Sequence, residues 1–301
     1  MSKNDEKRSG FVALIGAPNA GKSTLLNTVV GTKLAIVTHK VQTTRTRLLG
    51  IAMEGNSQII YVDTPGIFKP KRRLDRSMVS SAWQGANDAD IIVLLVDATA
   101  GLTKDVITIV EGLEKSGKKA ILALNKTDAV KKERILALTA ELKEKSCFSD
   151  IFMISALTGD GVEDLSKTLA QRVALGPWLF PEDQITDVTQ RSLAAEITRE
   201  KIFLRLHQEL PYSIWVATEK WQEQKDGSIR VEQIIHVERD GHKAIVIGKG
   251  GATLKAIGAG ARKDMAEVLG QKVHLFLFVK VSEKWTDSPF HYAEMGMDYV
   301  K

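Results

Sequence analysis

The sequence predicts an α/β domain built on a doubly wound sheet, followed by a smaller α+β domain. Short apolar runs alternate with helical patterns through the first half, and the first run opens into a glycine-rich loop. Near Gly176-Pro177 this alternation stops, and two strand-like runs joined by a turn signal follow further on. The domains that we expect are a disordered lead-in over 1–9, the first domain over 10–176, a linker over 177–190, the second domain over 191–282 and a tail over 283–301.

Composition limits the class of protein. With 301 residues, 44% of them hydrophobic and 26% charged, the chain can build two ordinary globular cores. The net charge of +5 permits a polyanionic partner without requiring one. The single cysteine, Cys147, excludes a disulfide framework within the chain, fits a reducing compartment and is expected to pack near a helix end.

No apolar run approaches the ~20 residues of a membrane span, and the polar N-terminus is no secretory signal, so we expect a cytoplasmic protein.

The first half has the rhythm of strand, helix, strand. Several apolar runs lack polar alternation, which is typical of parallel strands covered on both faces. The expected strands are Phe11–Ile15, Leu48–Met53, Gln58–Val62, Ile91–Val96, Ala120–Leu124 and Ile151–Ile154. The expected helices are Lys22–Val30, Asp75–Asn87, Lys104–Ser116, Lys131–Lys145 and Val162–Ala174. In such a sheet, ligands bind at the carboxyl ends of the strands.

The loop after the first strand has the pattern G-x-x-x-x-G-K-S and leads into a helix. This is the phosphate-binding loop in the context that confirms it, because its backbone N–H groups can surround an anion at a helix N-terminus. Lys22 is placed to reach the β- and γ-phosphates, and the Ser23 hydroxyl to hold Mg²⁺. The residues expected to line the phosphates are Gly16, Ala17, Pro18, Asn19, Ala20, Gly21, Lys22, Ser23 and Thr24.

Three more motifs follow strands, in the order that a guanine nucleotide site needs. Asp63-Thr64-Pro65-Gly66 offers a carboxylate that can bind Mg²⁺ through water, and the Gly66 N–H for the γ-phosphate. Asn125-Lys126-Thr127-Asp128 offers a carboxylate that can accept hydrogen bonds from N1–H and the exocyclic amine of guanine. The backbone of Ser155-Ala156-Leu157 can contact the guanine oxygen. An ATP-binding protein would not need Asn-Lys-x-Asp, so GTP or GDP is the expected ligand.

Together these motifs resemble the Ras-like GTPases, and among them the bacterial TrmE–Era group, over Phe11 to about Gly176. The resemblance implies that Val41–Arg45 is the first switch, with Thr44 favoured over Thr43 as a Mg²⁺ ligand in the GTP state. It also implies that Asp63–Arg73 is the second switch, with Lys22, Thr44 and Gly66 acting on the γ-phosphate. The basic residues of this second segment, Lys69, Lys71, Arg72 and Arg73, are expected to form a solvated loop.

Two residues bear on hydrolysis. Ile67 stands where Ras-like enzymes place a water-orienting glutamine, and its side chain has no hydrogen-bonding group. Catalysis would therefore depend on electrostatic stabilisation, with slow intrinsic turnover. Asn19 resembles the asparagine that binds K⁺ in potassium-stimulated members of the group. The alternative is that Asn19 only forms the turn.

The second half predicts a different domain. Trp178–Asp187 is expected to be a linker whose aromatic residues pin it to a neighbouring surface. A helical pattern from Leu193 to Leu210 ends at Pro211. The remaining elements are the strands Tyr212–Trp221 and Ile229–Arg239 around the turn Asp226-Gly227, a short apolar stretch Ala244–Ile247, the loop Gly248-Lys249-Gly250-Gly251, a helix from Leu254 to Leu269 and the strand Val273–Val281.

The order helix, strand, strand, short helix, Gly-x-x-Gly, helix, strand resembles a type II KH domain, which clamps single-stranded RNA at its glycine loop. Glycines admit the phosphates closely, and the amides that start the next helix favour anions. The residues expected to bind RNA are Lys243, Gly248, Lys249, Gly250, Gly251, Lys255, Arg262 and Lys263. The alternatives are a simple helix-start turn for the loop and a solvated helix face for Arg262-Lys263.

A GTPase domain followed by one type II KH domain resembles the Era family over nearly the whole chain. Pro181–Asp187 and Ala194–Lys201 look like the junction and the following helix of that family. The resemblance implies binding to the 3′ end of 16S rRNA, a role in assembly of the 30S subunit, a monomer, and peripheral contact with the inner face of the cell membrane. The tail has no usable motif, and its aromatic residues Trp285, Phe290 and Tyr292 are expected to pack on the last strand. Two rivals are a TrmE-like GTPase of tRNA modification and a non-enzymatic RNA-binding scaffold with GTP or GDP as a structural ligand.

Overall fold

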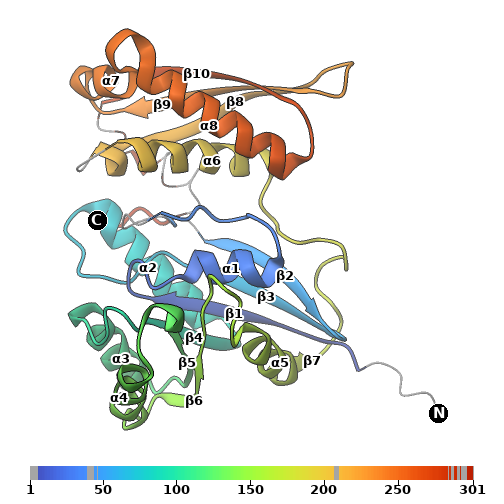
Figure 1. The fold of residues 1–301 in the computed structure, drawn as a ribbon, viewed down its shortest axis with the longest axis vertical. Helices are drawn as coiled ribbons and strands as arrows, with labels where there is room; N and C mark the ends of the chain where they lie inside the picture. The colour runs from blue at the N-terminus through green and yellow to red at the C-terminus, as the bar shows by residue number, and fades with distance from the viewer. Residues whose placement is uncertain are drawn as a thin grey trace. The chain divides into compact units, whose positions relative to one another are not determined.

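The computed structural model describes residues 6–38, 44–45, 47–206, 210–283, 285, 288–289, 292 and 297–300. It separates into two units (Figure 1). The first comprises Met1–Leu34, Thr44–Asp187 and Met295–Lys301, and the second Ala35–Thr43 and Val188–Glu294. The described helices include none that is long and apolar enough to cross a membrane.

The first unit is a sheet of seven strands with helices on both faces. Its strands are β1 (Arg8–Gly16), β2 (Leu48–Glu54), β3 (Ser57–Asp63), β4 (Ile91–Asp97), β5 (Ala120–Asn125), β6 (Phe148–Met153) and β7 (Ala174–Leu175). They run in the order β2-β3-β1-β4-β5-β6, with β7 paired to β1. The strands β3, β1, β4, β5 and β6 are mutually parallel, whereas β2 and β7 pair antiparallel with β3 and β1. The predicted doubly wound α/β sheet is therefore confirmed.

Five helices cover this sheet, and apolar residues at helical spacing face it. They are α1 (Lys22–Val30), α2 (Arg73–Asp88), α3 (Lys104–Ser116), α4 (Lys132–Lys143) and α5 (Val162–Arg172), with a 3₁₀ turn η1 at Thr127–Ala129. Residues of α2, α3 and α4 form one buried cluster with β1, β4 and β5, and α1 and α5 pack on the other face (Figure 1). Cys147 belongs to the buried cluster, where burial raises the pKa of its thiol, so its predicted packing role is confirmed.

The segment after β7 is pinned to this unit, as predicted for the linker. The Trp178 indole donates a hydrogen bond to the Asn56 carbonyl, at 3.0 Å. The Gln58 side-chain oxygen accepts from the Phe180 amide, at 3.0 Å, and Phe180 packs beside β2 and β3. Further along, the Ile185 carbonyl accepts from the Ile51 amide at 2.8 Å. The aromatic residues therefore fix the path of the chain as it leaves the sheet.

The second unit is a three-stranded sheet with helices on one face. Its strands are β8 (Trp215–Glu223), β9 (Ile229–Val237) and β10 (Val273–Val281), in the order β10-β9-β8. The pair β8 and β9 is antiparallel, and the pair β9 and β10 is parallel. The helices are α6 (Gln190–Arg205), α7 (Asp240–Ile247) and α8 (Ala252–Leu269), with 3₁₀ turns η2 (Leu210–Ser213) and η3 (Lys249–Gly251). Helices α6 and α8 pack on the sheet and on each other, and the expected KH-like order is confirmed.

Several boundaries differ from the prediction. Helix α6 ends at Arg205 instead of near Leu210, because Leu206 adopts an extended conformation. Leu206 and Leu210 are nevertheless buried in one apolar cluster with the sheet, so their apolar character reflects core packing and not a longer helix. Strand β8 starts at Trp215 and not at Tyr212, because η2 occupies the preceding residues. Likewise α5 ends at Arg172, where the short strand β7 takes over the residues predicted as helix.

In the tail, Trp285 and Tyr292 are fully buried, whereas Phe290 lies outside the described residues. The Trp285 indole donates a hydrogen bond to the Ser213 carbonyl of η2, at 3.0 Å. Trp285 therefore contacts η2, which lies between α6 and β8 in the chain.

Candidate functional site

The loop between β1 and α1 forms an anion-binding cradle. Gly16 lies so close to β4 that an added Cβ would approach the Leu95 carbonyl to 2.5 Å. Gly21 has a φ of 96°, which only glycine adopts readily, and precedes the first residue of α1. Helix α1 has no side-chain cap and no acidic residue in its first turn. Its first backbone N–H groups can therefore donate to a phosphate.

Lys22 lies inside this loop. Its Nζ donates to the carbonyls of Gly16 and Ala17, at 3.1 and 3.2 Å. Burial lowers the pKa of Lys22 to about 8, and the charge of Asp63 only partly opposes this effect. Phosphate oxygens beside Nζ would restore the preference for the charged form.

Three side-chain oxygens converge next to Lys22. The Ser23 hydroxyl donates to Asp63 Oδ2 at 2.8 Å, the Thr44 hydroxyl donates to the same oxygen at 2.9 Å, and the two hydroxyls lie 2.9 Å apart. Asp63 is fully buried, which raises the pKa of its carboxyl, and its Oδ1 has no hydrogen-bond partner.

An unpaired buried carboxylate oxygen beside two hydroxyls fits a hard divalent cation such as Mg²⁺, which prefers oxygen ligands. Among the described residues there is no cluster of three or more histidine, cysteine, aspartate or glutamate side chains that could hold a metal. The site next to Lys22 instead combines one carboxylate, from Asp63, with the hydroxyls of Ser23 and Thr44. Thr43, Val41 and Gln42 of the expected first switch lie outside the described residues.

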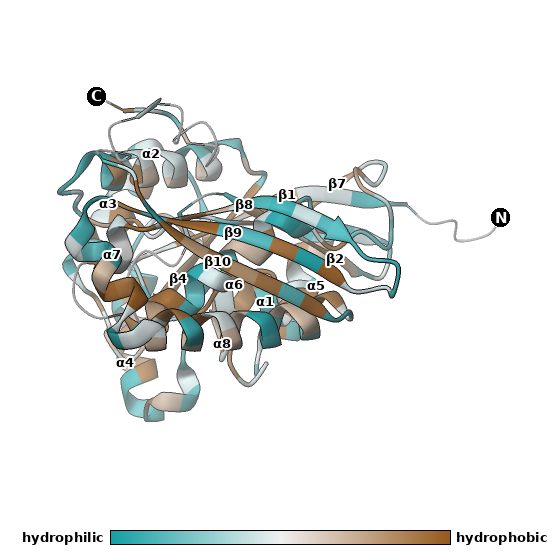
Figure 2. Cartoon of the chain, turned by 90° about the horizontal axis from the view of Figure 1, so that it is seen from above, coloured by the Kyte–Doolittle hydropathy of each residue, from teal (hydrophilic) through white to brown (hydrophobic). Residues whose placement is uncertain are grey.

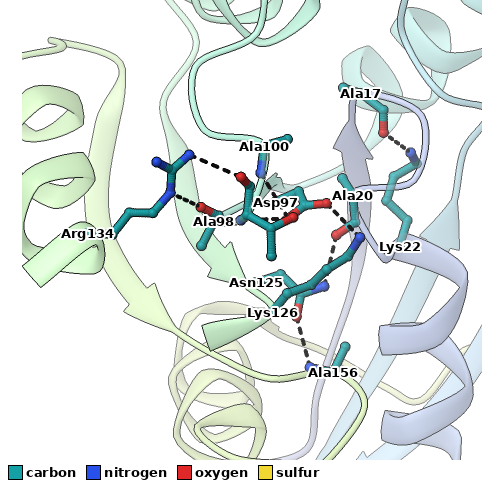
Figure 3. Close-up of polar contacts among 11 residues, drawn as sticks. Ala17, Ala20, Lys22, Asp97, Ala98, Ala100, Asn125, Lys126, Arg134 and Ala156 are labelled. Atoms are coloured by element: carbon teal, nitrogen blue, oxygen red, sulfur yellow. Dashed lines mark hydrogen bonds and ion pairs between the residues drawn. The ribbon is translucent and has the colours of Figure 1, made fainter. Parts of the chain in front are cut away.

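At the other end of the cradle, Asn125 connects three loops (Figure 3). Its amide nitrogen donates to the Ala20 carbonyl at 2.8 Å, and its amide oxygen accepts from the Ala156 N–H at 2.9 Å. A Cβ on Gly21 would lie 2.1 Å from the same amide nitrogen. Asn125 thus holds the phosphate loop against Ser155-Ala156-Leu157, and the side chain of Asp128 is exposed on η1 nearby in the chain.

The partners of Lys126 were not predicted from the sequence. Its Nζ pairs with Asp97 Oδ2 at 2.6 Å (Figure 3). Burial alone would raise the pKa of Asp97, but hydrogen bonds from Lys126 and Thr99 outweigh it and lower that pKa. Arg134 Nε donates to the Ala98 carbonyl at 2.9 Å and steadies the same loop (Figure 3). The one signal in the sequence was that Asp97 directly follows the predicted strand Ile91–Val96, and the structure places it in register with Asn125.

The second switch starts against the cradle. Gly66 lies so close to Pro18 that an added Cβ would be 3.0 Å from it, and the Ile67 N–H donates to the Gly16 carbonyl at 3.1 Å. The Ile67 side chain is buried in the apolar cluster and has no hydrogen-bonding group, so it cannot orient water at the cradle. Of the basic residues that follow, Lys69, Lys71 and Arg72 are exposed, as predicted for a solvated loop. Arg73 differs, because it donates to the Tyr299 hydroxyl and lies 4.8 Å from that ring.

The second candidate site is the glycine loop between α7 and α8. Gly248, Gly250 and Gly251 have φ values of 74°, 59° and 78°. An added Cβ on Gly248 would clash with Thr253 at 2.2 Å, whereas Cβ atoms on Gly250 and Gly251 would meet open space. The loop is therefore bare on its outer side, where a nucleic-acid backbone could approach.

Basic side chains accompany this loop. Lys249 is exposed in the loop itself, and Lys255, Arg262 and Lys263 are exposed on α8. Lys255 and Arg262 are seven residues apart on the helix and so share a face. Lys243 is half-buried on α7. The predicted RNA-binding residues thus lie on three consecutive elements, α7, η3 and α8.

Comparisons with known proteins match both halves of the chain. Residues 11–126 match the family described as 50S ribosome-binding GTPase, and residues 209–286 match the KH domain family. GTPase Era of Sinorhizobium medicae is 60% identical over 294 residues, covering 98% of this chain and 95% of the relative. GTPase Era of Mesorhizobium japonicum is 60% identical over 291 residues, covering 97% and 94%. A crystal structure of Era with MgGDPNP and nucleotides 1506–1542 of 16S ribosomal RNA superimposes with a TM-score of 0.91 at 39% identity, covering 96% of this chain and 99% of the other.

Proposed function

Because the chain belongs to the GTPase Era family, we propose that it is a GTP-hydrolysing switch that binds the 3′ end of 16S rRNA and assists assembly of the 30S ribosomal subunit. The observation that carries the GTP-binding part of this proposal is the cluster of the Ser23 and Thr44 hydroxyls around the buried Asp63 carboxylate, one oxygen of which has no hydrogen-bond partner. The RNA half is supported by the bare glycine loop and by the similar Era structure that contains 16S rRNA.

The residues present fit Mg²⁺ and a guanine nucleotide. Ser23 and Thr44 would hold Mg²⁺ directly, and Asp63 through water. When bound, the ion offsets charge on the phosphate oxygens. The backbone from Gly16 to Thr24 would surround the phosphates, Asp128 would accept from guanine, and Lys126 would lie along the base, held by Asp97. The family, the loop and the base motif together make GTP and GDP the ligands.

For hydrolysis, this chain supplies positive charge and fixed donors. Lys22 and the Gly66 N–H would stabilise the charge that develops on the γ-phosphate oxygens, and Thr44 would complete the cation shell. Ile67 is buried and has no group for orienting water, so the chain itself provides no base at that position. Slow intrinsic turnover follows from this electrostatic mechanism.

Asn19 is our candidate ligand for K⁺ beside the phosphates. It sits in the cradle with a φ of 63°, a conformation that asparagine tolerates and that also suits a simple turn. If K⁺ supplies the missing positive charge, phosphate release will be about tenfold faster in K⁺ than in Na⁺ at equal ionic strength. The Asn19→Asp variant, which keeps an oxygen ligand, would retain part of the stimulation, and Asn19→Gly would lose it. Equal wild-type rates in both salts would contradict the cation site.

The decisive experiment measures binding of 16S nucleotides 1506–1542, the fragment in the similar Era complex, with GDP and with a non-hydrolysable GTP analogue. A salt series should be included, because phosphate contacts make affinity fall steeply with ionic strength. We expect tighter binding with the GTP analogue. Absence of binding in both states would refute the RNA half of the proposal, and a parallel phosphate-release assay separates an enzyme from a scaffold.

The glycine loop allows a matched pair of variants for this experiment. Gly250→Asp and Gly250→Asn both place a side chain into open space at a φ that either residue tolerates. Only the aspartate adds a negative charge where phosphates would approach. We expect Gly250→Asp to abolish RNA binding and Gly250→Asn to weaken it less.

The family resemblance also suggests a monomer with peripheral membrane contact. Analytical sedimentation can test the oligomeric state, and vesicle flotation can test the membrane contact.

A further inference from the structure

The outer face of the second unit's sheet carries exposed aromatic side chains. Helices α6 and α8 pack on the inner face, against Val231 and Ile235 of β9 and their neighbours. Side chains alternate along each strand, so residues between these point outward. On β10 the outward residues are His274, Phe276, Phe278 and Lys280, all exposed. Phe276 and Phe278 are 41% and 54% exposed, which is unusual for two neighbouring phenylalanines.

The strand register places basic and aromatic groups side by side on this face. Phe276 is opposite Glu232, which in turn is opposite Lys220. Arg230 lies over the Phe276 ring, with its guanidinium carbon 4.5 Å from the ring centroid. The Glu232 carboxylate accepts from Arg230 Nε at 2.8 Å and lies 4.0 Å from Lys220 Nζ. The one acidic side chain among these residues is therefore paired with cations.

A hollow of about 710 Å³ adjoins these residues at the β8–β9 turn. It is lined by Phe276 and His274, by the cations Lys225 and Arg230, and by the carboxylates Glu223 and Asp226, among others. The lining of this hollow thus combines an aromatic ring, a guanidinium plane and hydrogen-bonding groups. Figure 2 shows β10 as a largely hydrophobic strand, beside β9, which carries both hydrophilic and hydrophobic residues.

This combination favours a nucleic-acid strand as the occupant over an apolar protein surface. Lys220, Lys225, Arg230 and Lys280 on this face and its hollow stand against the carboxylates of Glu223, Asp226 and Glu232, and this small excess of positive charge suits a polyanion. Flat rings and guanidinium planes stack on unpaired bases, and sheet faces bearing aromatic residues bind RNA in this way in other folds. Phe276 and Phe278 are two residues apart on one strand, about 6.8 Å, so each can accept a separate base.

We propose that this outer sheet face is a second RNA-contacting surface, on which unpaired bases outside the Gly-x-x-Gly clamp stack on Phe276 and Phe278. The inference rests on the proposed RNA-binding function and extends the RNA site beyond the loop Gly248–Gly251. Since a Gly-x-x-Gly clamp holds about four nucleotides, a longer strand has bases available for this face.

The test compares variants of the full chain in binding nucleotides 1506–1542 of 16S rRNA, the fragment present in the similar Era complex. We expect Phe276→Ala combined with Phe278→Ala to weaken binding roughly tenfold, as loss of base stacking does. The same pair changed to leucine should be weakened nearly as much, whereas the pair changed to tryptophan should retain affinity. A 2-aminopurine base placed at successive RNA positions should lose its quenching at the stacked positions only in the alanine and leucine variants.

Two control variants make the outcomes distinct. Leu136→Ala removes another exposed apolar residue, on α4, and should leave RNA binding unchanged. Gly250→Asp disrupts the clamp, so its failure to bind while the phenylalanine variants bind normally would uphold the proposed function and overturn the second surface. Full affinity in the leucine pair would overturn base stacking. Normal RNA binding by the alanine pair with loss of binding to small ribosomal subunits would instead make a ribosomal protein the occupant and refute the inference.

Discussion

Lys22 should make the stability of the nucleotide-free chain depend on pH. Burial lowers its pKa from 10.5 to about 8, so the folded chain disfavours a charge that the unfolded chain keeps. Between pH 8 and pH 10.5 the unfolded state binds more protons, and stability therefore rises with pH. Relative to wild type, Lys22→Met should be more stable by about 1–3 kcal/mol at pH 7, and this difference should shrink as pH rises toward 10.

Urea unfolding of both nucleotide-free proteins from pH 7 to pH 10 measures the difference. Lys22→Met also removes hydrogen bonds to the Gly16 and Ala17 carbonyls, but that loss is the same at every pH. The test is therefore how the difference in free energy of unfolding between the two proteins changes with pH. A difference that stays constant from pH 7 to pH 10 would show that Lys22 does not titrate in this range.

Asp128 should set the choice of base. Its exposed carboxylate offers two acceptors, which match the two donors on that edge of guanine. Asp128→Asn replaces one acceptor by a donor, so it mismatches guanine and suits xanthine, which has a carbonyl in place of the amine. We expect GTP affinity to fall roughly 100-fold or more and xanthosine triphosphate to bind instead. Competition titrations measure this, with Asp164→Asn on α5 as an exposed-carboxylate control that should change neither affinity.

At the scale of elements, Asn125 joins the end of β5 to the loops after β1 and β6. The Asn125→Ala variant leaves the Ala20 carbonyl and the Ala156 N–H without their side-chain partner in a buried place. We expect a loss of about 1–3 kcal/mol in the free energy of unfolding, with weaker nucleotide binding. Asn125→Asp keeps the acceptor for the Ala156 N–H but not the donor to the Ala20 carbonyl. Its free energy of unfolding should therefore fall between those of wild type and Asn125→Ala. An unchanged melting temperature in Asn125→Ala would contradict this function of the side chain.

The elements also show what sequence can and cannot predict. The bounds of α1 and α3 agree with expectation because Gly31 and Gly117, both in the left-handed conformation, end them. The two-residue strand β7 gives no periodic signal, and the end of α6 was misplaced because core-facing leucines continue past it. The pair Asp97–Lys126 depends on β4 lying beside β5, which no local pattern encodes. Motif residues of the candidate site could be predicted from sequence, whereas the residues that orient them could not.

At the scale of the whole molecule, the chain passes between its two units four times, after Leu34, Thr43, Asp187 and Glu294. The last crossing brings the C-terminal residues into the first unit. There the Val300 amide donates to the Ser77 hydroxyl of α2 at 3.3 Å, beside the contact of Tyr299 with Arg73. The second crossing ends immediately before Thr44, the expected Mg²⁺ ligand. The first switch therefore follows directly in the chain from Ala35–Thr43, and the end of the second switch contacts Tyr299, which lies shortly after the last crossing.

Glu200 is positioned to convey the nucleotide state along this connection. Its Oε1 accepts from the Val37 amide at 3.0 Å, and Val37 belongs to Ala35–Thr43. Glu200 also pairs with Lys201, at 3.2 Å, and Lys201 pairs with Asp264 of α8, the helix that starts at the glycine loop. A change at Thr44 on binding GTP would therefore act on a segment that is anchored within the RNA-binding unit.

We expect Glu200→Ala to uncouple RNA binding from the nucleotide. Allosteric coupling is commonly about 5- to 150-fold, so the ratio of RNA affinities with the GTP analogue and with GDP should fall from that range toward one. Glu200→Gln retains a carbonyl acceptor for the Val37 amide and should preserve most of the ratio. Nucleotide affinity in the absence of RNA, with circular dichroism, checks that Glu200→Ala is folded. If Glu200→Ala kept the full ratio, the nucleotide state would have to reach the RNA site by another connection, of which the C-terminal contact with α2 is the one to test next.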